Sequence, residues 1–195
     1  MGVPAIVHLI GFPASGKPTI ARALTEISAG SGDRFVVLDN HHTANVIFAA
    51  VDIDGVKPVP PAVWDRITEI SAVLLRTIEE LSPSDWSFVF TNVLTDEKPS
   101  ERGYVDRLVK LAHNTNRTYL PVLLQCSPES LMARVANPDR RDRMKWVNPS
   151  AGDEFVRTHR LIDIDDLAPL IIATSSVEPA DAARLILERL NDSDH

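Results

Sequence analysis

The feature of the sequence that most restricts its fold is an alternation between short apolar runs and longer amphipathic segments. Five runs rich in Val, Ile, Leu and Phe each end at a glycine or a polar residue, and they span 5–10, 35–38, 88–90, 119–124 and 170–173. Continuous apolar runs are typical of strands buried on both faces of a parallel sheet. The segments between them repeat apolar residues every three or four positions, which predicts helices. This order predicts a three-layer α/β fold with helices on both faces of a mainly parallel sheet.

The amphipathic segments predict helices over 19–28, 61–81, 102–113, 127–135 and 179–190. The chain has 195 residues and no repeat or linker that would divide it, so we expect a single domain over residues 1–195. In parallel sheets, ligands bind beyond the carboxyl ends of the strands. The polar residues that follow the apolar runs are therefore the candidate site residues.

Composition excludes several classes of protein. The chain has 20 Lys and Arg against 27 Asp and Glu, a formal net charge of -7, so a surface for a nucleic acid polymer is not expected. Cys126 is the single cysteine, so no intrachain disulfide can form. No run reaches the roughly 18 apolar residues of a membrane helix, and no signal-peptide pattern is present. We therefore expect a cytoplasmic protein without membrane contact, whose oligomeric state the sequence does not indicate.

A glycine-containing segment, Gly11-Phe12-Pro13-Ala14-Ser15-Gly16-Lys17-Pro18-Thr19, joins the first apolar run to the first helical segment. The pattern Gly-x4-Gly-Lys between a strand and a helix predicts a phosphate-binding loop. Glycines let successive backbone N–H groups converge on phosphate oxygens, and the following helix start adds partial positive charge. The residues assigned to nucleotide binding are Gly11, Ala14, Ser15, Gly16, Lys17, Pro18 and Thr19, with Lys17 on the outer phosphates.

Pro18 departs from this pattern, because Ser or Thr normally follows the lysine and its hydroxyl binds Mg²⁺. Proline has neither a hydroxyl nor an N–H group. Thr19 would supply the hydroxyl if the helix began one residue late, or Mg²⁺ would be held through water. The other interpretation is a weakened or nonfunctional site.

With this loop and its flanks, the chain resembles the small P-loop kinases, namely adenylate, shikimate and gluconate kinases and chloramphenicol phosphotransferase. The tight match is about a tenth of the chain, and the looser match of strand and helix order covers nearly all of it. The resemblance implies a P-loop NTPase fold with a five-stranded sheet in the order 2-3-1-4-5. It also implies ATP as donor, Mg²⁺ as cofactor and a mobile lid that carries arginines, but it does not identify the acceptor.

Asp39, Asn40 and His41 follow the second apolar run. A hydroxyl acceptor benefits from a carboxylate that orients it and takes its proton. In the kinases that resemble this chain, an aspartate at the end of this strand does that work or helps hold Mg²⁺, and Asp39 matches its position. The alternative for Asp39 is the N-cap of a helix over 43–50. Asn40 and His41 are candidates for contacting the acceptor.

Thr91 and Asn92 follow the third run, where a P-loop protein commonly has a metal-binding aspartate. Asn92 either hydrogen-bonds the substrate or a metal-bound water, or it is a turn residue. Because Pro18 and the missing aspartate both remove expected metal ligands, Asp39 and Thr19 are the candidate Mg²⁺ ligands.

Basic residues gather after the fourth run, and they include Arg134, Arg140, Arg141 and Arg143. Arginine stabilises the negative charge that spreads over a phosphoryl group during transfer. The resembling kinases have a basic lid here, so these four arginines are assigned to catalysis, with a lid over approximately 136–150. A solvated charged loop is the alternative. Thr174, after the fifth run, is expected beside adenine, which the resembling kinases usually contact by backbone.

The sequence therefore predicts an ATP- and Mg²⁺-dependent phosphotransferase that acts on a hydroxyl or phosphate of a small molecule. Two alternatives stay open. One is a nucleotide-binding module in which Pro18 has removed Mg²⁺ handling and phosphotransfer. The other is an NTP hydrolase or switch that acts through a protein partner.

Overall fold

The structure is a computed structural model that describes residues 3–51, 53, 59–135 and 149–192. Its strands are β1 (Ala5–Gly11), β2 (Arg34–Asp39), β3 (Trp86–Asn92), β4 (Thr118–Gln125) and β5 (Leu170–Ala173). Its helices are α1 (Lys17–Ala29), α2 (Asn40–Ala50), α3 (Pro61–Leu81), α4 (Pro99–Asn114), α5 (Pro128–Val135), α6 (Pro149–Thr158) and α7 (Pro179–Asp192), with a short 3₁₀ helix, η2 (Asp165–Leu167).

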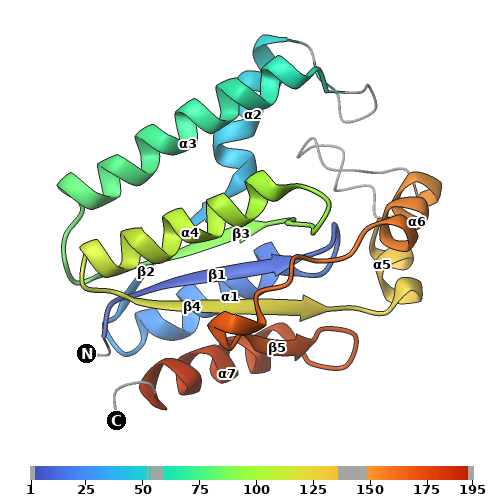
Figure 1. Cartoon of the computed structure of the whole chain (residues 1–195). Coiled ribbons are helices and arrows are strands. Elements are labelled where there is room, and N and C mark those ends of the chain that lie inside the picture. Colours follow the sequence, from blue (N-terminus) through green and yellow to red (C-terminus); the bar gives the residue numbers. More distant parts are fainter. Residues whose placement is uncertain (1–2, 52, 54–58, 136–148, 193–195) are drawn as a thin grey trace.

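The strands form one parallel sheet in the order β2-β3-β1-β4-β5 (Figure 1). This confirms the predicted fold class and strand order. Because all strands run the same way, their carboxyl ends meet at one edge. The glycine loop, Asp39 and Asn92 leave the sheet at that edge, from β1, β2 and β3 respectively.

Helices cover both faces of the sheet, which explains the continuous apolar runs. Val7 and Leu9 of β1 pack in a cluster with residues of α1 and α7. Ile6 of β1 and Phe88 of β3 point to the opposite face and pack against residues of α3 and α4. Figure 1 shows the resulting layers, with α3 and α4 on one side of the strands and α1 and α7 on the other. Every residue of β1 is buried.

Helices α1 and α2 begin earlier than the sequence predicted, and the residue before each helix explains the difference. α2 begins at Asn40 instead of residue 43, because the Asp39 carboxylate accepts a hydrogen bond from the His41 backbone N–H at 2.9 Å. α1 begins at Lys17 instead of residue 19, because Gly16 takes φ 96° and Pro18 is tolerated in the first turn. α3 and β5 have the expected bounds. Across the described ranges, every helix is too short or too polar to cross a bilayer.

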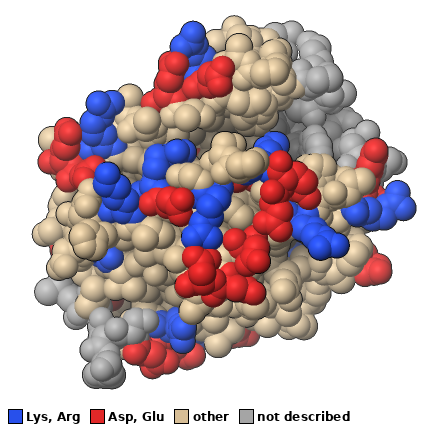
Figure 2. Space-filling model, in the orientation of Figure 1, with Lys and Arg blue, Asp and Glu red and all other residues tan. Residues whose placement is uncertain are grey.

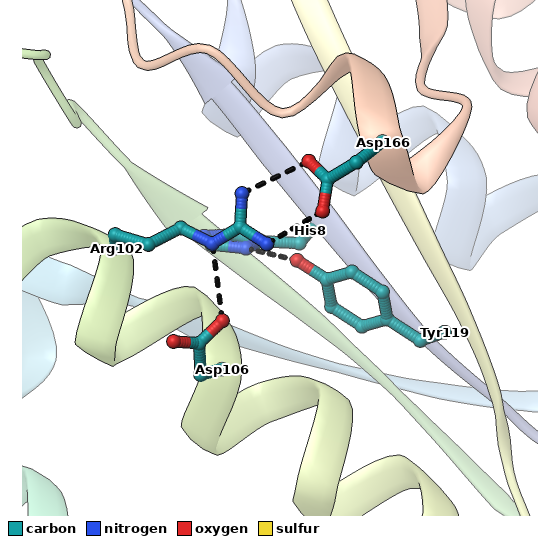
Figure 3. Close-up of polar contacts among 5 residues, drawn as sticks. All are labelled: His8, Arg102, Asp106, Tyr119 and Asp166. Carbon is teal, nitrogen blue, oxygen red and sulfur yellow. Dashed lines mark hydrogen bonds and ion pairs between the residues drawn. The ribbon is translucent and has the colours of Figure 1, made fainter.

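The segment from α6 to β5 returns across the α4 side of the sheet. Its Ile162 backbone N–H donates to the Leu94 carbonyl oxygen at 3.0 Å. Arg102 of α4 reaches Asp166 of η2 through two hydrogen bonds of 2.9 and 2.7 Å (Figure 3). The partners of this ion pair are well exposed, so it adds little to stability. Figure 2 shows acidic and basic side chains intermingled on this face.

Candidate active site

The glycine loop has the backbone shape of a phosphate cradle. Ala14 and Gly16 both have positive φ values, 68° and 96°, which turn the chain between β1 and α1. Gly11 is required for a different reason, because a Cβ atom there would lie 2.5 Å from Ser15 Oγ and 3.0 Å from the Leu124 carbonyl oxygen. The loop therefore fits closely against β4 and leads directly into the first turn of α1.

Lys17 folds back into this loop and is only 7% exposed. Its Nζ donates to the carbonyl oxygens of Gly11 at 2.6 Å and Phe12 at 2.9 Å, and it lies 3.5 Å from Ser15 Oγ. These contacts hold the ammonium charge inside the curve of the loop. A phosphate bound at the helix start would meet this charge together with the positive end of the α1 dipole.

The start of α1 bears on whether Thr19 can supply the hydroxyl that Pro18 lacks. That expectation required α1 to begin one residue late, whereas the helix begins at Lys17. The backbone N–H of Thr19 donates to the Gly16 carbonyl oxygen at 3.0 Å, and its side chain is exposed. Pro18 lies between Lys17 and Thr19, in the first turn of α1.

Asp39 is the N-cap of α2 and also the last residue of β2. Its carboxylate is half-buried and accepts from the His41 N–H. The imidazole Nδ1 of His41 lies 3.1 Å from Asn45 Oδ1, which ties His41 to its own helix. Asn40 is likewise the first residue of α2, and its carbonyl oxygen accepts from Thr43 Oγ1 at 3.1 Å. Three of the four predicted acceptor residues, Asp39, Asn40 and His41, thus belong to one helix start.

Asn92 ends β3 and is held by a side chain that the sequence analysis did not single out. Asn92 Oδ1 lies 3.0 Å from Nε2 of His8, a fully buried residue in the middle of β1. The other ring nitrogen, Nδ1, lies 2.9 Å from the Tyr119 hydroxyl on β4 (Figure 3). Burial lowers the pKa of His8 to about 4, although the hydrogen bond to Asn92 opposes the shift. Burial also raises the pKa of Tyr119, so both groups are neutral near pH 7.

Arg134 of α5 connects the loop after β5 to the glycine loop. Its Nη2 donates to the Thr174 carbonyl oxygen at 2.7 Å, and its Nη1 lies 3.8 Å from where a Cβ of Gly16 would be. The buried Thr174 hydroxyl donates to the Gln125 carbonyl oxygen at 3.1 Å. Arg134 and Thr174 therefore meet beside the glycine loop.

α6 contacts the glycine loop through aromatic rings. The ring of Phe12 meets that of Phe155 edge to face, with centroids 6.1 Å apart, and Phe155 stacks on His159 at 4.0 Å. The expected lid over 136–150, with Arg140, Arg141 and Arg143, lies outside the described residues except for positions 149 and 150, which begin α6.

Neither protein-family models nor curated protein sequences match this chain. Solved structures match it over nearly its whole length. A candidate kinase from Chloroflexus aurantiacus J-10-fl has a TM-score of 0.65 and 19% identity, covering 95% of this chain and 98% of that chain. A gluconokinase from Sinorhizobium meliloti 1021 has a TM-score of 0.60 and 16% identity, covering 99% and 97%.

The APS kinase CysC of Mycobacterium tuberculosis, solved in complex with AMPPNP and APS, has a TM-score of 0.57 and 13% identity, covering 97% of this chain and 99% of that chain. The chain has the fold of the small P-loop kinases. Identities this low establish the P-loop fold alone, so the chemistry has to be argued from the residues of the site.

Proposed function

We propose that this P-loop protein transfers the terminal phosphoryl group of ATP to a hydroxyl or phosphate group of a small molecule. The observation that carries the proposal is the buried ammonium group of Lys17 inside the positive-φ loop at the carboxyl edge of the sheet. β3 separates β1 from β2, so Asp39 leaves the sheet about 10 Å from the end of β1. That spacing leaves room for a phosphoryl group between the loop and the carboxylate.

Each group has a role that follows from its place. The loop N–H groups and Lys17 hold the phosphates and neutralise part of their charge. Arg134 lies beside Gly16 and would neutralise charge on the transferring phosphoryl group. The Thr174 loop, which Arg134 contacts, lies where the nucleotide base would extend. Asp39 orients the acceptor hydroxyl and takes its proton as transfer proceeds.

The donor set for Mg²⁺ is small. Within the described ranges, no group of three or more His, Cys, Asp or Glu side chains is placed to hold a metal. Thr91 pairs with Asp39 across β2 and β3, and its buried hydroxyl has no hydrogen-bond partner in the described part of the chain. Mg²⁺ commonly binds through phosphate oxygens, water and one or two carboxylates. Asp39 and the Thr91 hydroxyl would therefore hold the ion with its nucleotide, and the ion would neutralise phosphate charge.

Calorimetric titration of ATP, first with Mg²⁺ and then with EDTA, tests the nucleotide site. We expect tighter binding with Mg²⁺, and at least a tenfold loss of affinity in Lys17→Ala because one charge-assisted contact is removed. Lys110→Ala, an exposed lysine on α4, is the matched control and keeps wild-type affinity. Unchanged affinity in folded Lys17→Ala would refute the loop assignment.

Release of ADP in the presence of gluconate, shikimate or APS tests the transfer step. Release that depends on one of these compounds supports the phosphotransferase. Release that no compound stimulates would indicate an NTP hydrolase instead. Metal-independent ATP binding without release would indicate a nucleotide-binding module.

A further inference from the structure

His8 is the polar exception in an otherwise apolar, fully buried strand. It has no exposed surface, and its neighbours Val7 and Leu9 are equally buried. Placing an imidazole there is unfavourable unless both ring nitrogens are hydrogen-bonded. Both are, through Asn92 at 3.0 Å and Tyr119 at 2.9 Å. The cost of burying His8 is thus offset by contacts to strands on either side of β1.

The chemistry of the partners fixes the direction of each hydrogen bond. An amide oxygen can only accept, so His8 Nε2 carries the proton and donates to Asn92 Oδ1. The neutral ring then accepts at Nδ1, and the Tyr119 hydroxyl donates to it. Tyr119 therefore donates to His8, and His8 in turn donates to Asn92.

This pairing determines which end of the Asn92 amide faces the carboxyl edge. In the sheet register Asn92 lies opposite Ile10, and His8 lies two residues back along β1. Asn92 Oδ1 therefore points back along the strands, and its NH₂ group points forward, beyond the end of β3. Asn92 is half-buried, and in the described part of the chain this NH₂ group donates to no protein atom.

We propose that His8 is a positioning residue that presents the Asn92 NH₂ group to the phosphoryl acceptor. The acceptor then carries a hydrogen-bond-accepting oxygen at that point, such as a carboxylate, carbonyl or phosphate oxygen. The inference rests on the proposed phosphotransferase function, because it assumes that the acceptor binds between Asp39 and the end of β1. It adds to the strand-end candidate Asn92 an orienting partner, His8, which the strand-end pattern does not include.

A purely structural role for His8 predicts different behaviour. The same hydrogen bonds join β4, β1 and β3, and they would serve sheet register even if Asn92 touched no ligand. In that case, losing either partner would lower stability without a selective effect on the acceptor. The two roles are separable because each ring nitrogen has its own partner.

A pair of matched variants isolates the Asn92 contact. The side-chain amide of Gln reaches the place of imidazole Nε2, so His8→Gln keeps a donor for Asn92. The shorter amide of Asn reaches only the place of Nδ1. His8→Asn therefore keeps an acceptor for Tyr119 and loses the hydrogen bond to Asn92. Asn92→Asp keeps an acceptor for His8 but removes the NH₂ group, and its half-buried position makes it the variant that best preserves folding.

The measurements are acceptor KM and kcat, ATP affinity, and the side-chain amide NMR signal of Asn92, with gluconate, shikimate and APS as probes. We expect at least one probe to shift the wild-type Asn92 signal. For that probe, His8→Asn and Asn92→Asp raise KM about tenfold, the size of one lost hydrogen bond. His8→Gln stays within about threefold of wild type, and ATP affinity is unchanged in both His8 variants.

Three results would overturn the proposal. One is equal KM values for His8→Gln and His8→Asn, and another is a wild-type KM in Asn92→Asp. The third is a wild-type Asn92 signal that none of the three probes moves. Failure of the proposed function is distinguishable, because it appears as absent ATP binding in the wild-type protein.

Discussion

The buried imidazole of His8 makes the stability of the fold depend on pH. Burial lowers the pKa of His8 from its ordinary 6.5 to about 4. Between these values the unfolded chain binds a proton that the folded chain does not, so stability is lost as pH falls. The loss approaches about 1.4 kcal/mol per pH unit within this window. It amounts to about 2 kcal/mol between pH 7 and pH 5, and to about 3 kcal/mol below pH 4.

Urea unfolding of the wild-type protein and of His8→Gln at pH 7 and pH 5 measures the contribution of His8 to the loss of unfolding free energy. Glutamine does not titrate, and the carboxylates and other histidines are common to both proteins, so their contributions cancel in the comparison. We expect the wild type to lose about 2 kcal/mol more than His8→Gln between the two pH values. Parallel losses in the two proteins would refute the reasoning from burial, whatever their absolute stabilities.

Other predictions concern the loop and the strand ends. Gly11→Ala should lose about 1–3 kcal/mol of unfolding free energy in urea, because its Cβ collides with Ser15 Oγ. Gly103→Ala on α4, whose Cβ meets only a flexible arginine end, should be neutral or stabilising, and equal effects would contradict the steric argument. Asp39→Asn keeps the helix cap and should lower turnover at least 100-fold with ATP affinity retained, whereas Asp39→Ala also loses about 1 kcal/mol of stability. Wild-type turnover in Asp39→Asn would show that Asp39 serves only as the N-cap of α2. Pro18→Ser restores the missing hydroxyl and should increase the ratio of ATP affinities with and without Mg²⁺; an unchanged ratio would show that this position does not govern the metal.

The strands were predictable because both of their faces are buried. Each apolar run locates its strand to within two residues at either end, and β5 matches at both. The strand order could not be predicted from the apolar runs, because they do not indicate which strands are neighbours. The resemblance to the P-loop kinases implied the order, and the sheet confirms it.

The site was predictable where the signal was local. The glycine loop and the cap alternative for Asp39 depend on residues a few positions apart, and the structure shows both. His8 was missed because it was included in an apolar run. Its partners are 84 and 111 residues away, so no local pattern relates them. A lone histidine inside a run of Val, Ile and Leu is the signal that could have indicated it.

The central place of β1 has a consequence for how the chain is made. β1 is made before its two neighbours in the sheet, β3 and β4, and β4 begins only at Thr118. At about 5–20 residues per second, the apolar N-terminal strand waits several seconds with unpaired edges. Such edges are open to pairing with other chains, so the nascent protein is most exposed to aggregation before β4 is complete. The glycine loop is subject to the same delay, because Gly11 lies against Leu124 of β4 and that contact forms only after β4 has been made.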